Sequence, residues 1–423
     1  MQLIFYTFFL WLYKTAIRIV SPWNQKARLW LLGRKDIMRK ISSLQLPSAR
    51  PRIWMHCASL GEFEQGRPII EKLRRDIPEL IVVISFFSPS GYETKKDYTG
   101  ADHVLYLPED SESNARAFVD AIHPNLVLWI KYEYWYFYLR ELKTRNIPVL
   151  LVSAIFIADQ PFFKWHGALY RSMLTCFSRI FVQNEDSRKM LDSLGLSSQT
   201  EVAGDTRFDR VVEIASSFER LPVIESFCGN SKVIVAGSTW EEDEEELDHY
   251  ANTHSEIKFI IAPHEIDEDH LRDIEELFHH CIRFSVWENQ TKTMSSLAAD
   301  KNVLLIDNIG MLSRLYHYAT ICYVGGGLGD DGVHNVLEAA VYGKPVVYGP
   351  VIEKYNEAVE LSACGGGIIV ESAIEAEGVF ERLFSDLSEY NIACEAARNY
   401  VYENKGATEK LVKYIYENRL LTN

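Results

Sequence analysis

A glycine-rich stretch in the second half of the chain holds the residues best suited to binding a phosphate group. Residues 321–324 are β-prone, glycines occupy 325–327, and a short helical run leads to a second β-prone run at 346–348. This order predicts one βαβ unit with its glycine loop at the carboxyl end of the first strand, where open parallel sheets bind ligands. Glycine there lets the backbone approach a phosphate closely, and the next helix offers unpaired N–H groups.

Two polar residues begin the helical run of that unit. Asn335 and Glu338 have the N-x-x-E spacing that is typical of a capping box. Helix-start chemistry alone therefore explains these two residues as well as a bound ligand does. Spacing does not separate the two interpretations, and both stay open at this point.

Composition excludes several classes of protein. A chain of 423 residues is too long for one ordinary core, and two domains of about 200 residues are expected. The formal charge of −15 argues against nucleic acid as the main partner. The seven cysteines form no C-x-x-C pair and mostly lie in apolar runs, which indicates reduced core residues with neither a disulfide framework nor a zinc site.

The N-terminus is apolar and then basic. Residues 1–13 carry no charge, and apolar character continues past Lys14 to Val20 without a small-residue cleavage site. Eight basic residues oppose one acid, Asp36, within the first 40 positions. A basic head on an acidic body is typical of a protein that touches anionic lipid. A tilted spanning anchor and an interfacial helix both fit, and in either case the basic residues predict a cytoplasmic body.

The rest of the chain alternates β-prone runs with helical stretches, which predicts two doubly wound parallel sheets. The expected strands of the first series are 52–59, 81–87, 103–107, 126–130, 149–153 and 180–183, and those of the second are 233–236, 259–262, 303–306, 321–324 and 346–348. After the first strand we expect a turn at 60–62 and a helix at 68–75 with Pro68 in its first turn. The acidic run 241–246 suits the first turns of a helix and is interpreted as a solvated face.

These patterns divide the chain into three parts. Residues 1–22 are expected to form a membrane anchor or interfacial helix, residues 23–210 a first α/β domain, and residues 211–423 a second α/β domain. The looser pattern at 204–229 indicates the link between the two domains. The last helix, from about Thr408, is expected to pack back on the first domain.

Four motifs identify a family. They are CASLGEFEQGRP at 57–68, QNEDS at 183–187, GDTRFDR at 204–210 and VGGGLGDDGVHNVLEAA at 324–340. In this order and spacing, and with the apolar N-terminus, they make the chain resemble the 3-deoxy-D-manno-octulosonic acid (Kdo) transferases of lipopolysaccharide synthesis over nearly its whole length. The resemblance implies a GT-B type fold, with two Rossmann-like domains facing a central cleft and an N-terminal membrane-anchoring helix.

The resemblance also implies two catalytic residues in the first domain. Glu62 matches the family's catalytic base, and a carboxylate within hydrogen-bond reach suits proton removal from an attacking sugar hydroxyl. The alternative is an acid that only caps the following turn. Arg207 matches a basic position near the reacting phosphate, where a cation offsets the charge of the departing nucleotide. Its alternative is an ion pair with Asp205 or Asp209.

The implied donor contacts lie in the second domain. The residues that match the family's donor-binding positions are Pro263 and His264 in a short turn, Ile309, Gly310 and Met311 in a loop against the cytidine, and Asn335, Val336, Leu337 and Glu338 around the ribose and phosphate. This chain departs from the family in two places. His264 replaces the usual arginine, and Lys131 replaces the usual acid two residues before Glu133. A lysine cannot perform a carboxylate's role, although Lys131 could face an acceptor phosphate.

The resulting expectation is an inverting, membrane-associated transferase. It moves Kdo from CMP-Kdo to a lipid A precursor at the cytoplasmic face of the cell inner membrane, in contact with anionic inner-membrane lipid. Neither a metal nor a cofactor beyond the donor is expected. The alternatives are another GT-B transferase or an epimerase that uses a UDP-sugar, and a non-catalytic membrane-associated scaffold with the same fold.

Overall fold

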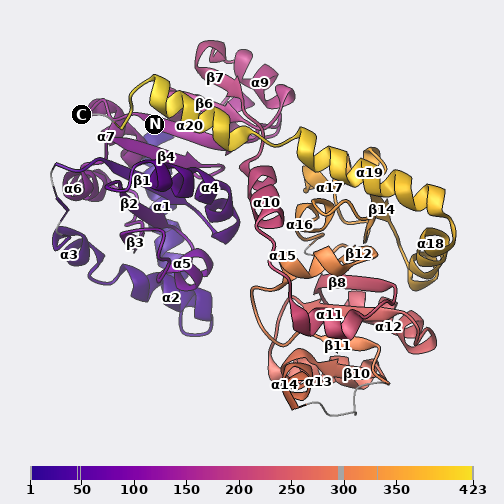
Figure 1. The fold of residues 1–423 in the computed structure, drawn as a ribbon. Coiled ribbons are helices and arrows are strands. Elements are labelled where there is room, and N and C mark those ends of the chain that lie inside the picture. The colour runs from indigo at the N-terminus through magenta and orange to yellow at the C-terminus, as the bar shows by residue number, and fades with distance from the viewer. Residues whose placement is uncertain (1, 45, 48, 294–299, 331, 422–423) are drawn as a thin grey trace. The chain divides into compact units, whose positions relative to one another are not determined.

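The computed structural model describes residues 2–44, 46–47, 49–293, 300–330 and 332–421. The chain divides into two compact units (Figure 1). The N-terminal unit consists of residues 1–210 and 406–423, and the C-terminal unit of residues 211–405. Each unit contains a seven-stranded sheet. The fold is of the GT-B type.

The sheet of the N-terminal unit is parallel and has the order β3-β2-β1-β4-β5-β6-β7. The strands are β1 Arg52–Cys57, β2 Ile81–Phe86, β3 His103–Tyr106, β4 Leu126–Ile130, β5 Val149–Ala154, β6 Arg179–Val182 and β7 Thr200–Val202. Every residue of β1, β2, β4 and β5 is buried, as expected for parallel strands that are covered on both faces. The strand order reverses between β1 and β4.

Helices cover both faces of this sheet. They are α1 Gln2–Val20, α2 Gln25–Arg34, α3 Ile37–Ser42, α4 Leu60–Asp76, α5 Pro89–Lys95, α6 Glu112–Ile122, α7 Tyr136–Thr144, α8 Ala168–Leu174, α9 Glu185–Asp192 and α20 Ala407–Glu417, while α10 Thr206–Ser216 continues into the other unit. Alternate residues of β1 point to opposite faces. Trp54 therefore packs with α6 and α7, and Met55 with α4 and α20.

The last helix completes the core of the N-terminal unit. Leu411, Val412 and Ile415 of α20 are buried in the same cluster as Phe63 of α4, and Figure 1 shows the yellow α20 returning to this unit. The carboxylate of Asp209 accepts the N–H groups of Gly406 at 2.6 Å and Thr408 at 2.8 Å. Asp209 thus satisfies backbone donors at the start of α20.

The helix after β1 starts earlier than the sequence predicts. The helix predicted at 68–75 is present, but the expected turn at 60–62 and the first-turn position of Pro68 are wrong, because α4 begins at Leu60 and contains Pro68 in its interior. Ser59 is the extended N-cap residue, and its carbonyl accepts the N–H of Phe63 at 3.1 Å. Proline removes one helical N–H donor, but Ile69, Ile70 and Leu73 beside it are fully buried and hold the helix on the sheet. Glu62 therefore lies in a helical first turn.

The sheet of the C-terminal unit is also parallel, with the order β10-β11-β9-β8-β12-β13-β14. Its strands are β8 Val233–Thr239, β9 Lys258–Pro263, β10 Cys281–Arg283, β11 Val303–Leu305, β12 Ile321–Val324, β13 Val346–Tyr348 and β14 Gly367–Ile369. The order reverses between β8 and β12. Sequence patterns did not predict β7, β10 or β14, which are three-residue strands at sheet edges and are too short to show a period.

The helices of this unit include one whose charge pattern was misinterpreted. They are α11 Pro222–Cys228, α12 Glu241–Thr253, α13 Glu268–Leu277, α14 Phe284–Thr293, α15 Leu312–Leu315, α16 Leu337–Ala340, α17 Asn356–Ala363, α18 Ala373–Ser385 and α19 Leu387–Glu403. The acidic run does begin α12, but it is not a solvated face throughout. The exposed fraction is 1% for Asp243 and 2% for Glu244, so these two carboxylates have protein partners.

The apolar helix α1 lies along the N-terminal unit. Among the described residues it is the one helix long and apolar enough to cross a membrane. Polar contacts fasten it at several points: Gln2 Nε2 donates to the carbonyl of His166 at 2.9 Å, the Tyr6 hydroxyl donates to Asp110 at 2.6 Å, and Lys14 Nζ donates to Glu109 at 2.5 Å. Its other side exposes large apolar residues, among them Ile4, Phe5, Phe8, Phe9, Trp11 and Leu12.

Candidate active site

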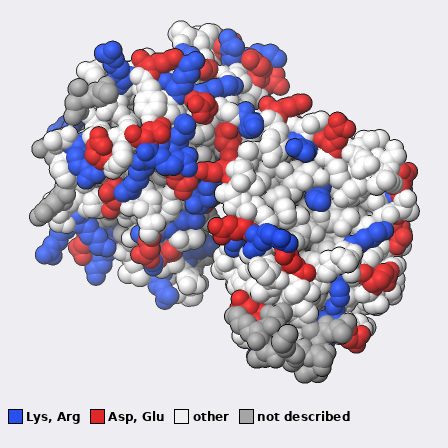
Figure 2. Space-filling view, in the orientation of Figure 1, with Lys and Arg blue, Asp and Glu red and all other residues white. Residues whose placement is uncertain are grey.

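Polar residues of the N-terminal unit gather where its strand order reverses. Glu62 follows β1, and Lys131 and Glu133 follow β4, so all three lie at the carboxyl edge of adjacent strands. This is the position at which doubly wound sheets bind ligands. Space-filling atoms in Figure 2 show Lys and Arg side chains interleaved with carboxylates over this unit.

Glu62 is buried, and its surroundings favour the protonated, neutral form of its carboxyl group. Its side chain accepts the N–H of Ala58, and 7% of the residue is exposed. Burial first, and then the charge of Glu133, raise the pKa of Glu62, the charge of Lys131 opposes both effects, and the net pKa is about 7. The bond to Ala58 agrees with a capping role. A carboxyl group that titrates near pH 7 is also suited to accept a proton there.

A buried polar chain holds the neighbouring carboxylate. Nε2 of His56 lies 3.2 Å from Oε2 of Glu133, and Nδ1 of His56 lies 2.9 Å from Oγ of Ser85. The indole N–H groups of Trp135 and Trp54 donate to Glu133 at 3.1 Å and to Ser85 at 2.8 Å. Sequence analysis did not single out His56. Its position in a fully buried strand, on the face of Trp54, was the available signal.

Arg207 forms an ion pair that also ties it to α4. Its Nε and Nη2 lie 2.9 and 2.8 Å from the Asp205 carboxylate, and Gln65 Nε2 on α4 donates to the same carboxylate at 3.1 and 3.2 Å. Burial of Asp205 opposes its ionisation, but the charge and hydrogen bonds of Arg207 hold its pKa below the ordinary value. Arg207 therefore forms the ion pair that the sequence analysis considered, with Asp205 as its partner. Asp209 instead accepts backbone N–H groups at the start of α20. Gln65 links Arg207 to the helix that carries Glu62.

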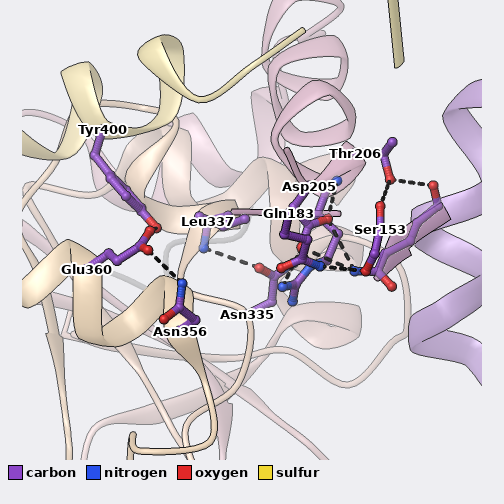
Figure 3. Close-up of polar contacts among 11 residues, drawn as sticks. Ser153, Gln183, Asp205, Thr206, Asn335, Leu337, Asn356, Glu360 and Tyr400 are labelled. Atoms are coloured by element: carbon purple, nitrogen blue, oxygen red, sulfur yellow. Dashed lines mark hydrogen bonds and ion pairs between the residues drawn. The ribbon is translucent and has the colours of Figure 1, made fainter. Parts of the chain in front are cut away.

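Three non-glycine residues at strand ends adopt left-handed backbone conformations. They are Lys131 with φ 59°, Ser153 with φ 53° and Ser238 with φ 55°, next to β4, β5 and β8. The strand register shifts beside Ser153 and Ser238. Figure 3 shows Ser153 held by Gln183, which donates to its carbonyl at 3.1 Å, and by Thr206, whose Oγ1 lies 3.3 Å from Ser153 Oγ. Such conformations are uncommon and concentrate at functional sites.

In the C-terminal unit a carboxylate already occupies the glycine loop. Oδ2 of Asp243 accepts the N–H groups of Gly326 at 2.8 Å and Trp240 at 3.0 Å, and Oδ1 accepts the Tyr323 hydroxyl at 2.8 Å. The sequence analysis predicted that backbone N–H groups of this loop would bind a phosphate. The N–H of Gly326 instead donates to Asp243 within the protein. Glycine is still required, because a Cβ at Gly325 would lie 2.4 Å from the carbonyl oxygen of Ser238.

The predicted capping box at Asn335 and Glu338 is replaced by a different local arrangement. Oδ1 of Asn335 accepts the N–H of Leu337 at 3.2 Å, and its Nδ2 donates to Glu338 at 3.0 Å. The helix begins one residue later than a cap at Asn335 requires, with Val336 as its N-cap. Val336 and Leu337 are fully buried, so a ligand can meet only their backbone. Figure 3 shows this turn beside a second polar group, in which Glu360 accepts Tyr400 and Asn356.

His264 belongs to an aromatic stack. Its ring centroid lies 4.7 Å from that of Trp240 and 4.3 Å from that of His334, and Trp240 Nε1 donates to His334 Nε2 at 3.0 Å. The three residues follow β9, β8 and β12, and Pro263 ends β9. Sequence analysis missed Trp240 and His334. The position of Trp240 directly after β8 could have identified it, whereas His334 lies in the longer loop after β12.

The loop after β11 presents an apolar side chain to the surface. Ile309 is 87% exposed, and Gly310 has φ 96°, which favours glycine. Met311 is the N-cap of α15, and its carbonyl accepts the N–H of Arg314 at 2.9 Å. An exposed aliphatic residue on a loop at the carboxyl edge suits contact with a planar base.

The described residues contain no group of three or more His, Cys, Asp and Glu side chains that could hold a metal ion.

A family model and curated relatives both point to glycosyltransferases. Residues 33–210 match a family model described as 3-deoxy-D-manno-octulosonic-acid transferase (kdotransferase). A bifunctional glycosyltransferase/methyltransferase of Fusobacterium nucleatum is 27% identical over 420 residues, covering 96% of this chain and 61% of that protein. The chain thus spans about three fifths of that relative. A 3-deoxy-D-manno-octulosonic acid transferase of Aquifex aeolicus is 26% identical over 361 residues, or 82% of this chain and 90% of that protein.

A solved structure supports the fold alone. The UDP-GlcNAc 2-epimerase from Neisseria meningitidis, bound to UDP-GlcNAc, superposes with a TM-score of 0.62 at 19% identity, covering 87% of this chain and 100% of that chain.

Asp243→Asn tests the bound carboxylate of the glycine loop. Both oxygens of Asp243 accept hydrogen bonds, whereas the side-chain amide of asparagine has a single oxygen and carries no charge. The free energy of unfolding should therefore fall by roughly 1–3 kcal/mol. Urea denaturation measures the change. Glu242→Gln, at the exposed neighbouring position of α12, is the matched control and should leave stability within about 0.5 kcal/mol. Equal stability of the two variants would contradict the assigned role of Asp243.

Proposed function

Because this chain is a relative of the Kdo transferases, which are glycosyltransferases, we propose that it transfers Kdo from CMP-Kdo to a hydroxyl of a lipid A precursor with inversion. The observation that carries the proposal is Glu62, a buried carboxyl group at the sheet edge whose pKa is raised to about 7. A group of this kind is ionised in part at neutral pH and can receive a proton from an attacking hydroxyl.

The reaction moves one proton and exchanges one bond. The acceptor oxygen bonds to the anomeric carbon of Kdo while its proton passes to Glu62. The bond from that carbon to the phosphate oxygen breaks, and its electron pair leaves with CMP. Attack from the face opposite the phosphate inverts the anomeric centre. Arg207 is fixed by Asp205, which Gln65 of α4 also bonds, and it supplies positive charge for the departing phosphate.

Lys131 has a role that fits its charge. Its positive charge lowers the pKa values of both Glu62 and Asp205, so one ammonium group favours the ionised form of both carboxyl groups. Without it, burial and Glu133 would keep Glu62 protonated to a higher pH. Lys131 thus maintains the ionised base, and it can also attract an acceptor phosphate.

The donor binds the C-terminal unit, and the protein needs no metal or further cofactor. Cytidine packs against the loop of Ile309, Gly310 and Met311 and against His264 beside Pro263. Glu338 accepts ribose hydroxyl groups, and the backbone of Asn335, Val336 and Leu337 lies near the phosphate. The exposure of Ile309 and the stacking of His264 between two aromatic rings support this arrangement.

The protein works at the cytoplasmic face of the inner membrane. The exposed apolar side of α1 and the basic residues that follow it support binding to anionic lipid. The acceptor and the enzyme then share one surface.

Donor choice separates this function from its alternatives. With a tetraacylated disaccharide acceptor, product should form with CMP-Kdo and not with UDP-sugars, as measured by mass spectrometry of the lipid. The structural likeness to a UDP-GlcNAc 2-epimerase makes UDP-GlcNAc the most useful rival donor. Conversion of a UDP-sugar alone would establish the rival enzyme, and inactivity with every donor would favour the scaffold.

Glu62→Gln tests the base. The amide keeps the size and the acceptor for Ala58 but takes no proton, so kcat should fall 10²–10⁴-fold, or roughly 3–5 kcal/mol of barrier. CMP affinity should be unchanged. Because the pKa is raised from 4.5 in the unfolded chain to about 7 in the folded protein, Glu62 costs stability increasingly between these pH values and fully at pH 8, where the variant should melt no lower than wild type. Glu64→Gln, two residues along α4, is the matched control. Near-normal turnover of a folded Glu62→Gln protein would remove this residue from the mechanism.

The pH dependence of kcat tests the cause of the raised pKa. Since the base must be ionised, the rate should rise with pH and level off above about 7. Glu133→Gln removes the neighbouring charge that raises this pKa and should shift the acid limb to lower pH. The Glu64→Gln profile should match wild type. An unshifted limb in Glu133→Gln would show that Glu133 does not act on Glu62.

A further inference from the structure

An aromatic cavity lies within the N-terminal unit between α1 and the sheet edge. Its volume is about 220 Å³, and Trp11, Tyr13, Trp30, Phe87 and Trp135 form much of its wall. These rings pack on one another: the Phe87 centroid is 4.6 Å from that of Trp135, 5.9 Å from that of Trp30 and 6.2 Å from that of Tyr13. The wall is thus a continuous apolar surface contributed by α1, α2 and the segments after β2 and β4.

The charged groups that border the cavity are neutralised within the protein. Lys14 pairs with Glu109 at 2.5 Å. Asp110 accepts the Tyr6 hydroxyl at 2.6 Å and the N–H groups of Phe137 and Tyr138 at 3.2 Å. Because these bonds are complete, an alkyl chain in the cavity would not desolvate an uncompensated charge.

The cavity connects the exposed side of α1 with the catalytic edge. Trp11 is 58% exposed and also lines the cavity, so the wall continues the apolar surface of Phe5 and Phe8. At the other side, Trp135 donates to Glu133, whose charge acts on Glu62. The N–H of Phe87 donates to the carbonyl of Cys57 at the end of β1 at 3.2 Å. The wall therefore reaches the strand end that precedes the base.

We propose that this cavity holds one acyl chain of the lipid acceptor and so fixes the sugar hydroxyl relative to Glu62. The proposal rests on the proposed function, because it assigns a subsite for the same acceptor. The apolar wall binds the chain, and the exposed face of α1 brings the remaining chains to the membrane surface.

The test compares acceptors that differ only in their chains. Leu10 also lines the cavity, and Leu10→Trp narrows it. The matched control is Leu32→Trp, at an exposed position of α2 outside the cavity. Wild-type protein should favour the tetraacylated disaccharide over the same disaccharide without acyl chains. Leu10→Trp should lower this ratio of kcat/KM values roughly tenfold or more, as expected for loss of a few buried methylenes. Leu32→Trp should preserve the ratio.

The outcomes distinguish the subsite from the function. Transfer by wild type with an unchanged ratio in Leu10→Trp would overturn the subsite alone, whereas absence of transfer to either acceptor would overturn the proposed function. A tetraacylated disaccharide with a diazirine at one chain end gives a readout that does not need turnover. Its photolabel should fall on peptides that contain Trp11, Tyr13 or Trp30. Labelling elsewhere, or labelling that phosphatidylglycerol blocks as well as unlabelled acceptor does, would overturn the proposal.

Discussion

The repulsion that the half-buried Glu133 exerts on the buried Glu62 organises the carboxyl edge of the sheet in the N-terminal unit. Burial is the larger cause of the raised pKa of Glu62, and Glu133 lies near enough for its charge to add to that effect. Such a pair persists only where the surroundings fix both groups. His56 and Trp135 bond to Glu133, the Ala58 N–H bonds to Glu62, and the ammonium group of Lys131 offsets their charge. The reversal of strand order between β1 and β4 brings these residues together.

In the C-terminal unit a buried carboxylate is stabilised by hydrogen-bond donors. Asp243 collects two backbone N–H groups and a tyrosine hydroxyl, so its carboxylate makes the glycine loop rigid before any ligand arrives. Bonds of this kind are charge-assisted and strong. The side chains that follow the strands at this edge are aromatic or apolar, among them His264, Trp240 and Ile309.

The sequence predicts the sheets better than it predicts the site. Strands such as β4, β12 and β13 have the predicted bounds because residues buried on both faces form short continuous apolar runs. The start of α4 was wrong because the first-turn preference of Pro68 was given more weight than the N-cap position of Ser59. Asp243 and Glu244 were read as solvated because acids at a helix start look alike in sequence whether they face water or a buried donor. The bonds of His56 depend on the register of β1 against β2 and β4, which no local pattern encodes.

The return of α20 to the first unit has a consequence for biosynthesis. Leu411, Val412 and Ile415 belong to the core that contains Phe63, yet a ribosome makes them only after the whole of residues 211–405. Those residues form one uninterrupted unit and can fold as soon as they have left the exit tunnel, since domains fold as units. The N-terminal unit must instead wait until α20 has also emerged, and until then α20 does not cover the α4 face of its sheet. The unit that starts first along this sequence therefore becomes complete after the unit that is inserted into it.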